Sequence, residues 1–131
     1  MKKLFCATFV LLSFCSFAQA DANKVITERV FTVNERVNLQ MAYDARLNEL
    51  DLTDDQLYKY TTIIDDNVFY MIDYNRKGTR TRADIEKYMS KKVADQDREL
   101  KKLLSTEQYK KHLEIYNAVI ITPIQNRLKS M

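Results

Sequence analysis

The chain offers few residues for acid–base, nucleophilic or metal chemistry. It has one histidine, His112, and two cysteines, Cys6 and Cys15, among 131 residues. A Ser-His-Asp or Cys-His arrangement needs a histidine beside its nucleophile, and sites for soft metal ions need several His or Cys ligands. His112 lies beside Lys110 and Lys111, which indicates an exposed or half-buried helix residue and not a ligand. We therefore expect no enzyme activity, no metal site and no cofactor.

Two groups of carboxylates remain to be considered. Asp65 and Asp66 are adjacent on an expected helix, where neighbouring side chains point in different directions, so they make no catalytic dyad. The segment from Asp73 to Asp84 has the outline of a calcium-binding EF-hand loop, with Asp, Asn, Gly and Asp at positions 1, 3, 6 and 12. Lys77, at position 5, would place an ammonium among the ligands. We favour a basic helix–Gly–helix turn and keep a metal- or calcium-responsive sensor as the least favoured alternative.

The first twenty residues have the pattern of a cleavable secretory signal peptide. Lys2 and Lys3 precede an apolar stretch from Leu4 to Phe17, and Ala18-Gln19-Ala20 fits the small-x-small cleavage rule. Cleavage there removes both cysteines and leaves residues 21–131 as a single domain. We expect an exported, periplasmic protein that does not insert into the membrane after cleavage and that does not bind nucleic acid.

The composition of the chain predicts an all-α fold. One Gly and one Pro are too few for a β-sandwich or barrel, which needs frequent turn residues. Apolar residues at spacings of three and four predict four helices, near 24–50, 54–76, 82–104 and 106–129. Pro123 should kink or end the last of them. The apolar stripe expected for the first helix consists of Val30, Val33, Val37 and Met41.

Two of the expected helices begin with the same local motif. Thr53 and Gln56, and again Ser105 and Gln108, have the spacing of a capping box, in which both side chains bond backbone N–H groups. With the preceding leucines these are two LTxxQ motifs, 52 residues apart, the second with Ser in place of Thr. The motif residues are Leu52, Thr53, Gln56, Leu104, Ser105 and Gln108.

These two motifs, behind a signal peptide in a Gly-poor chain of this size, resemble the Spy/CpxP-type LTxxQ proteins of the Gram-negative periplasm. The resemblance covers roughly residues 45–117. It implies a bent, elongated helical hairpin that pairs into an antiparallel, cradle-shaped homodimer. It also implies one of two functions in the stress response: an ATP-independent chaperone for unfolded proteins, or an adaptor that docks on the periplasmic domain of a sensor kinase.

Charge is distributed unevenly along the expected domain. Residues 21–75 hold five Lys/Arg and eleven Asp/Glu, a net −6, whereas residues 76–111 hold twelve and six, a net +6. Such a pattern is most often explained by solvated faces that orient helices against each other. The alternative is a basic surface that attracts acidic, partly unfolded clients, flanked by tyrosines that lie off the apolar stripes. Its candidate residues are Arg76, Arg80, Lys87, Lys91, Lys102, Tyr58, Tyr70 and Tyr88.

Overall fold

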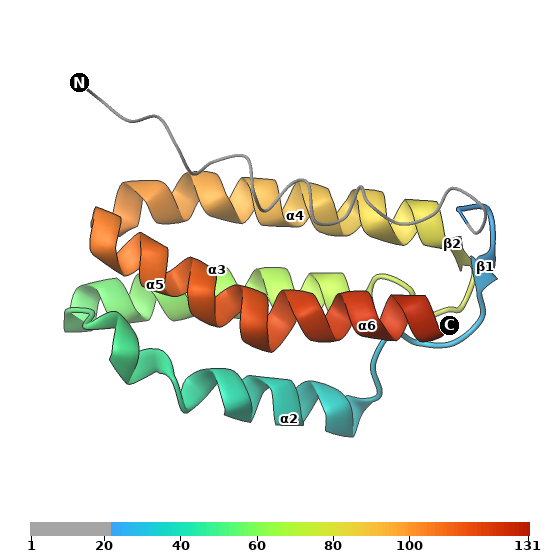
Figure 1. The fold of residues 1–131 in the computed structure, drawn as a ribbon, viewed down its shortest axis with the longest axis horizontal. Coiled ribbons are helices and arrows are strands. Elements are labelled where there is room, and N and C mark those ends of the chain that lie inside the picture. The colour runs from blue at the N-terminus through green and yellow to red at the C-terminus, as the bar shows by residue number, and fades with distance from the viewer. Residues whose placement is uncertain (1–21) are drawn as a thin grey trace.

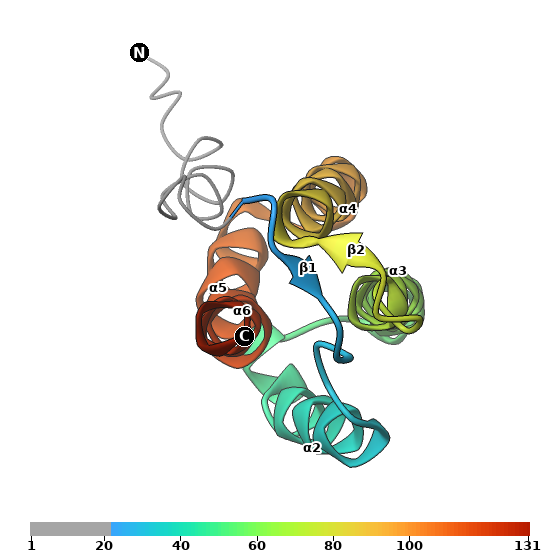
Figure 2. The same cartoon turned by 90° about the vertical axis from the view of Figure 1, so that its right-hand side faces the viewer.

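Four helical arms form a bundle in the computed structural model, which describes residues 22–131 (Figure 1). In the end-on view the arms occupy four corners, and α2 and α4 lie at opposite corners (Figure 2). The predicted all-α class is confirmed, whereas the predicted signal peptide at 1–20 lies outside the described residues. The helices are α2 (Val33–Asp44), the 3-10 helix η2 (Leu47–Leu50), α3 (Asp54–Asp73), α4 (Arg82–Leu103), α5 (Thr106–Tyr116), the π-helical turn η3 (Asn117–Ile121) and α6 (Thr122–Ser130).

The expected helix over 24–50 is wrong in its first part. Residues 22–32 are not helical: they form a turn, the short strand β1 (Val25–Ile26) and several bends, and β1 pairs antiparallel with β2 (Arg80–Thr81) in a two-residue ladder. The first N–H groups of a helix have no acceptor within it, and this segment supplies acceptors for two of those of α4. The carbonyls of Lys24 and Ala22 accept from the N–H groups of Arg82 and Ala83, each at 2.9 Å. The start of the domain therefore satisfies the N-terminus of α4.

The apolar stripe expected along the first helix is also wrong. Val33, Val37 and Met41 are 54%, 48% and 65% exposed, and Val30 is buried in the non-helical segment before α2. Helix α2 begins only at Val33, because Thr32 and Glu35 form a capping box there. It packs on the bundle through its opposite side, where Tyr43 is buried. One face of α2 thus carries apolar side chains that no described residue covers.

The other apolar stripes are confirmed. Helix α3 buries Tyr60, Ile64, Val68 and Met71, and only Leu57, at the start of its stripe, is exposed. The core continues through the remaining arms, with Ile85, Met89, Val93, Gln96 and Leu100 from α4 and Ile115, Tyr116, Ile120, Ile121, Ile124 and Leu128 from the last arm. Among the described helices, none combines the length and the apolar character needed to cross a bilayer.

Pro123 neither ends nor sharply interrupts the last arm. It lies in the first turn of α6, directly after the π-helical turn η3. Proline has no N–H and its ring crowds the carbonyl four residues before it. The wider π turn, in which the Thr122 N–H donates to the Asn117 carbonyl, accommodates this ring and keeps the arm continuous.

Candidate functional site

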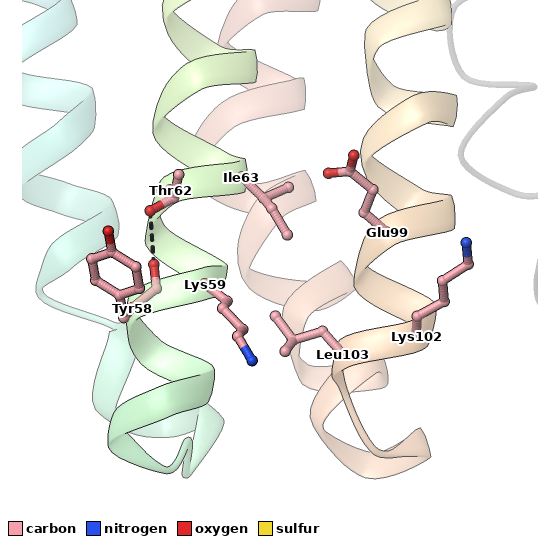
Figure 3. A pocket seen from close by; sticks show the side chains of 7 residues that line it. All are labelled: Tyr58, Lys59, Thr62, Ile63, Glu99, Lys102 and Leu103. Atoms are coloured by element: carbon pink, nitrogen blue, oxygen red, sulfur yellow. Dashed lines mark hydrogen bonds between the residues drawn. The ribbon is translucent and has the colours of Figure 1, made fainter.

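The outer seam between α3 and α4 contains an apolar pocket near the end of the bundle where the two capping boxes lie (Figure 3). Ile63 of α3 and Leu103 of α4 point toward one another across the seam, whereas the ring of Tyr58, which is 74% exposed, points from α3 away from α4. The pocket measures about 470 Å³ and is also lined by Lys59, Thr62, Glu99 and Lys102. An exposed apolar hollow of this size, rimmed by charged groups, suits an apolar side chain of a partner.

A row of tyrosines and cations continues along the same seam toward the other end of the bundle. The rings of Tyr74 and Tyr88 stack in parallel, with centroids 3.8 Å apart. Arg80 lies over the ring of Tyr74 at 4.7 Å, and Lys92 lies 4.9 Å from the ring of Tyr70 and 5.5 Å from that of Tyr88. Such contacts hold cations over aromatic faces while leaving their charge available to an anion.

The spacing of residues on the two antiparallel helices explains why the pocket and the tyrosine row lie in line. The α3 residues 59, 63, 70 and 74 are separated by four, seven and four positions, which places them on one face of the helix. The α4 residues 88, 92, 99 and 103 repeat the same separations in reverse. From Tyr58 to Tyr74 the seam extends over about 24 Å, at 1.5 Å per helical residue. We call this strip the α3–α4 seam.

All eight predicted surface residues line the α3–α4 seam or a hollow beside its tyrosines. Tyr58 and Lys102 line the pocket, Arg80, Tyr70 and Tyr88 belong to the row, and the exposed Lys87 and Lys91 line a hollow beside Tyr74 and Tyr88. Arg76, 4.0 Å from Asp73, lines another hollow together with Tyr74 and Arg80. Tyr88 is half-buried instead of exposed because Tyr74 covers one face of its ring.

Sequence reasoning did not assign Lys59, Ile63, Tyr74 and Leu103 to this surface, because the apolar residues at helical spacing were expected in the core. Lys92 was expected only as one member of the basic stretch from Arg76 to Lys102. The signal that identifies them is the matched four-seven-four spacing on two antiparallel helices, which has meaning only once the pairing of α3 with α4 is known.

The two capping boxes meet at one end of the bundle. Both are complete, because the side chains of Thr53 and Ser105 accept from the N–H groups of Gln56 and Gln108, and the glutamine side chains accept from the cap N–H groups. The two carboxamides also bond each other, at 3.0 and 3.1 Å between Nε2 and Oε1. Each Nε2 donates further to a backbone carbonyl just before the other box, Gln56 to Leu103 and Gln108 to Asp51. The motif thus joins two chain segments and is part of the fold.

His112 is not exposed or half-buried, as its charged neighbours had indicated, but fully buried. Its Nδ1 lies 2.7 Å from the hydroxyl of Tyr60, which also contacts the hydroxyl of Tyr43. Burial lowers the pKa of His112 to about 3, so the imidazole is neutral at pH 7. Tyr109 and Tyr116, three residues before and four after it, share its face of the helix. That pattern could have revealed the burial from sequence.

The loop that resembled an EF-hand uses its polar groups for structure. The Asn75 amide donates to the carbonyls of Ile26 and Glu28 at 2.8 and 2.9 Å, and its oxygen accepts from the Arg80 N–H. Asp84 belongs to the capping box of α4 with Thr81. Among the described residues, no three His, Cys, Asp or Glu side chains gather in a way that could hold a metal ion.

Gly78 completes this turn. Its φ is +64°, and a Cβ there would collide with the backbone carbonyl of Thr27. The geometry therefore agrees with the favoured interpretation, a helix–Gly–helix turn that anchors the start of the domain.

Comparison with known proteins returned no match: no family model, no curated protein and no solved structure matches the chain.

Proposed function

We propose that this protein is an exported, ATP-independent chaperone of the LTxxQ type that binds unfolded or misfolded client proteins along the α3–α4 seam. In this proposal residues 1–20 are a signal peptide, the protein acts in the periplasm, and two copies pair into a homodimer. The observation that carries the proposal is the continuous strip formed by an apolar pocket and a cation–tyrosine row on one exposed face.

The two parts of the strip contribute differently to binding. Lys87, Lys91 and Lys102 are exposed, so their field reaches acidic client segments before contact and accelerates capture. That attraction decays over about 8 Å at physiological ionic strength. The pocket between Ile63 and Leu103 then retains apolar side chains, by an attraction that salt does not screen. Capture should weaken as salt rises, while holding should persist.

The direct test is light scattering from a denatured client, with and without an equal molar amount of the purified protein and without nucleotide. We expect suppressed aggregation. The Lys87→Glu/Lys91→Glu variant should slow capture of an acidic client about threefold to tenfold at low salt, since exposed charges mainly set the association rate. Ile63→Ala should leave capture unchanged and shorten the time for which clients are held, because Ile63 lines the pocket.

Matched controls separate the seam from the rest of the surface. Lys110→Glu/Lys129→Glu makes the same change in net charge on other helices, and Val33→Ser removes an exposed apolar side chain from α2. Both should behave like the parent protein. If several acidic and neutral clients aggregate equally with and without the protein, the chaperone proposal fails, and a sensor-kinase adaptor becomes the better explanation of the same surface.

A further inference from the structure

A second exposed apolar surface lies on the other side of α3, where it faces α2. Val33, Val37 and Met41 form a ridge at four-residue spacing along α2, about 12 Å long at 1.5 Å per residue. Beside it a cleft of about 380 Å³ opens between α2 and α3, lined among others by Val37, Val68 and the half-exposed Phe69. Four apolar side chains that water reaches in one contiguous area indicate a binding surface. We call the ridge and the cleft together the α2–α3 cleft.

The polar groups around the α2–α3 cleft are mainly carboxylates. Asp65 and Asp66 line it, and the amide of Gln40 bridges Asp65 and Asp44 at 3.1 and 2.9 Å. Burial, together with the nearby charges of Asp44 and Asp66, raises the pKa of Asp65. The one cation that lines the cleft, Arg36, lies over the ring of Phe69 at 5.1 Å. Three carboxylates against one guanidinium leave the cleft net negative.

From this combination we infer that the α2–α3 cleft binds a cationic amphipathic helix. Apolar side chains of the ligand would pack on Val33, Val37, Met41 and Phe69, and its Lys or Arg side chains would lie against Asp44, Asp65 and Asp66. This site takes ligands of the opposite charge from those proposed for the α3–α4 seam, and it goes beyond the chaperone proposal.

The shape of the surface favours a helical ligand. Side chains spaced every three or four residues along a helix match the ridge of α2, which has the same spacing. An extended ligand gains most when it can pair with an open strand edge, and helices alone line the cleft.

The charge argues against two other occupants. An anionic phospholipid surface would meet carboxylates. A second copy related by a two-fold axis through the cleft would place Asp65 and Asp66 near their own counterparts. A cationic helix meets neither penalty.

The test uses an 18-residue peptide of leucine and lysine arranged as an amphipathic helix, with affinity for the purified protein measured by calorimetry. Two comparison peptides share its length: one has the same residues in scrambled order, and one has glutamate in place of lysine. We expect the patterned lysine peptide to bind about tenfold tighter than either comparison peptide, a difference of about 1.4 kcal/mol. Circular dichroism should show that it becomes helical on binding.

Variants locate the site. Asp65→Asn/Asp66→Asn should weaken binding about fivefold at low salt and less at high salt, because the lost attraction is screened. Val37→Ser/Met41→Ser should weaken it about as much at any salt. Glu28→Gln/Glu107→Gln makes the same charge change elsewhere and should bind like the parent. All substituted side chains are exposed, and thermal melts will verify that each variant is folded.

The inference is overturned if the scrambled peptide binds as tightly as the patterned one, or if the cleft variants bind like the parent. It is also overturned if sedimentation shows a dimer that Val37→Ser/Met41→Ser dissociates, because a second copy then occupies the cleft. Since Ile63→Ala and Lys87→Glu/Lys91→Glu test the α3–α4 seam alone, failure of either proposal leaves the other standing.

Discussion

At the scale of single residues, the burial of His112 makes the stability of the fold depend on pH. Its neutral ring is buried against Tyr60, Tyr109 and Tyr116, and none of these tyrosines can neutralise an imidazolium. The pKa of His112 is lowered to about 3, whereas in the unfolded chain it stays near the ordinary value of 6.5. Between these two pH values the imidazole is protonated in the unfolded chain but not in the folded one. Protonation therefore favours the unfolded state, and the free energy of unfolding decreases as the pH falls below about 6.5.

We expect His112→Gln to flatten the acid side of the stability profile. Over the pH range between the two pKa values, the parent should lose about 1.4 kcal/mol more per pH unit than the variant. The measurement is urea unfolding from pH 7 to pH 4, read as the difference between the two proteins, so that the carboxylates common to both cancel. Parallel curves would show that the imidazole is not neutral in the folded protein.

Residue identity alone predicted the helix caps and failed for His112, and the reason is physical. A capping box is closed by side chains three residues apart, so Thr53, Gln56, Ser105 and Gln108 could be assigned without knowledge of the fold. The local pattern of Tyr109 and Tyr116 indicates a buried face around His112, but the polar partners of its ring, Tyr43 and Tyr60, lie on α2 and α3, more than 50 residues away. The same limit hid the bond between Gln56 and Gln108.

At the scale of elements, the capping boxes set where helices begin and also join two arms of the bundle. Thr53→Ala and Ser105→Ala should each lower the free energy of unfolding by about 1 kcal/mol, because each leaves a helix N–H without its partner. Thr81→Ala removes the equivalent cap of α4, which has no partner motif, and should cost about the same. Chemical denaturation of the three variants measures these losses. If Thr53→Ala and Ser105→Ala unfold like the parent, the motif does not act as a cap.

The element that sequence periodicity described least well is α2. A cap signal was present, because Thr32 and Glu35 have the same three-residue spacing as the other boxes. The valine stripe that crosses this position suggested a continuous helix instead. Periodicity finds an apolar face but does not say what covers it. The side of α2 that packs on the bundle is the one with Tyr43, which was grouped with a secondary stripe.

At the scale of the whole molecule, opposite charges lie on different faces of the bundle. The α3–α4 seam carries exposed lysines beside tyrosines, and the α2–α3 cleft carries carboxylates beside aliphatic side chains. Helix α3 belongs to both, with one side toward each. The net charges of the two halves of the sequence predicted this separation, but only the packing shows which apolar groups accompany each charge.

The arms of the bundle should also differ in local stability, and α2 should be the least stable. A helix holds its backbone hydrogen bonds mainly through the apolar surface that it buries against its neighbours. Within α2 only Tyr43 is fully buried, whereas α3 buries five side chains and α4 buries six. The ridge of α2 faces water, and along the chain the short η2 segment connects α2 to α3. We expect its amides to exchange with deuterium at least about tenfold faster than those of α3 and α4, through local opening that leaves the other arms folded.

Native-state hydrogen exchange read by NMR measures this directly, and α5, capped by Ser105, serves as the internal reference. Addition of the patterned lysine peptide should slow exchange in α2 selectively. Equal protection of α2 and α4 would mean that the bundle opens only as a unit, and that the exposed ridge does not weaken the arm that carries it.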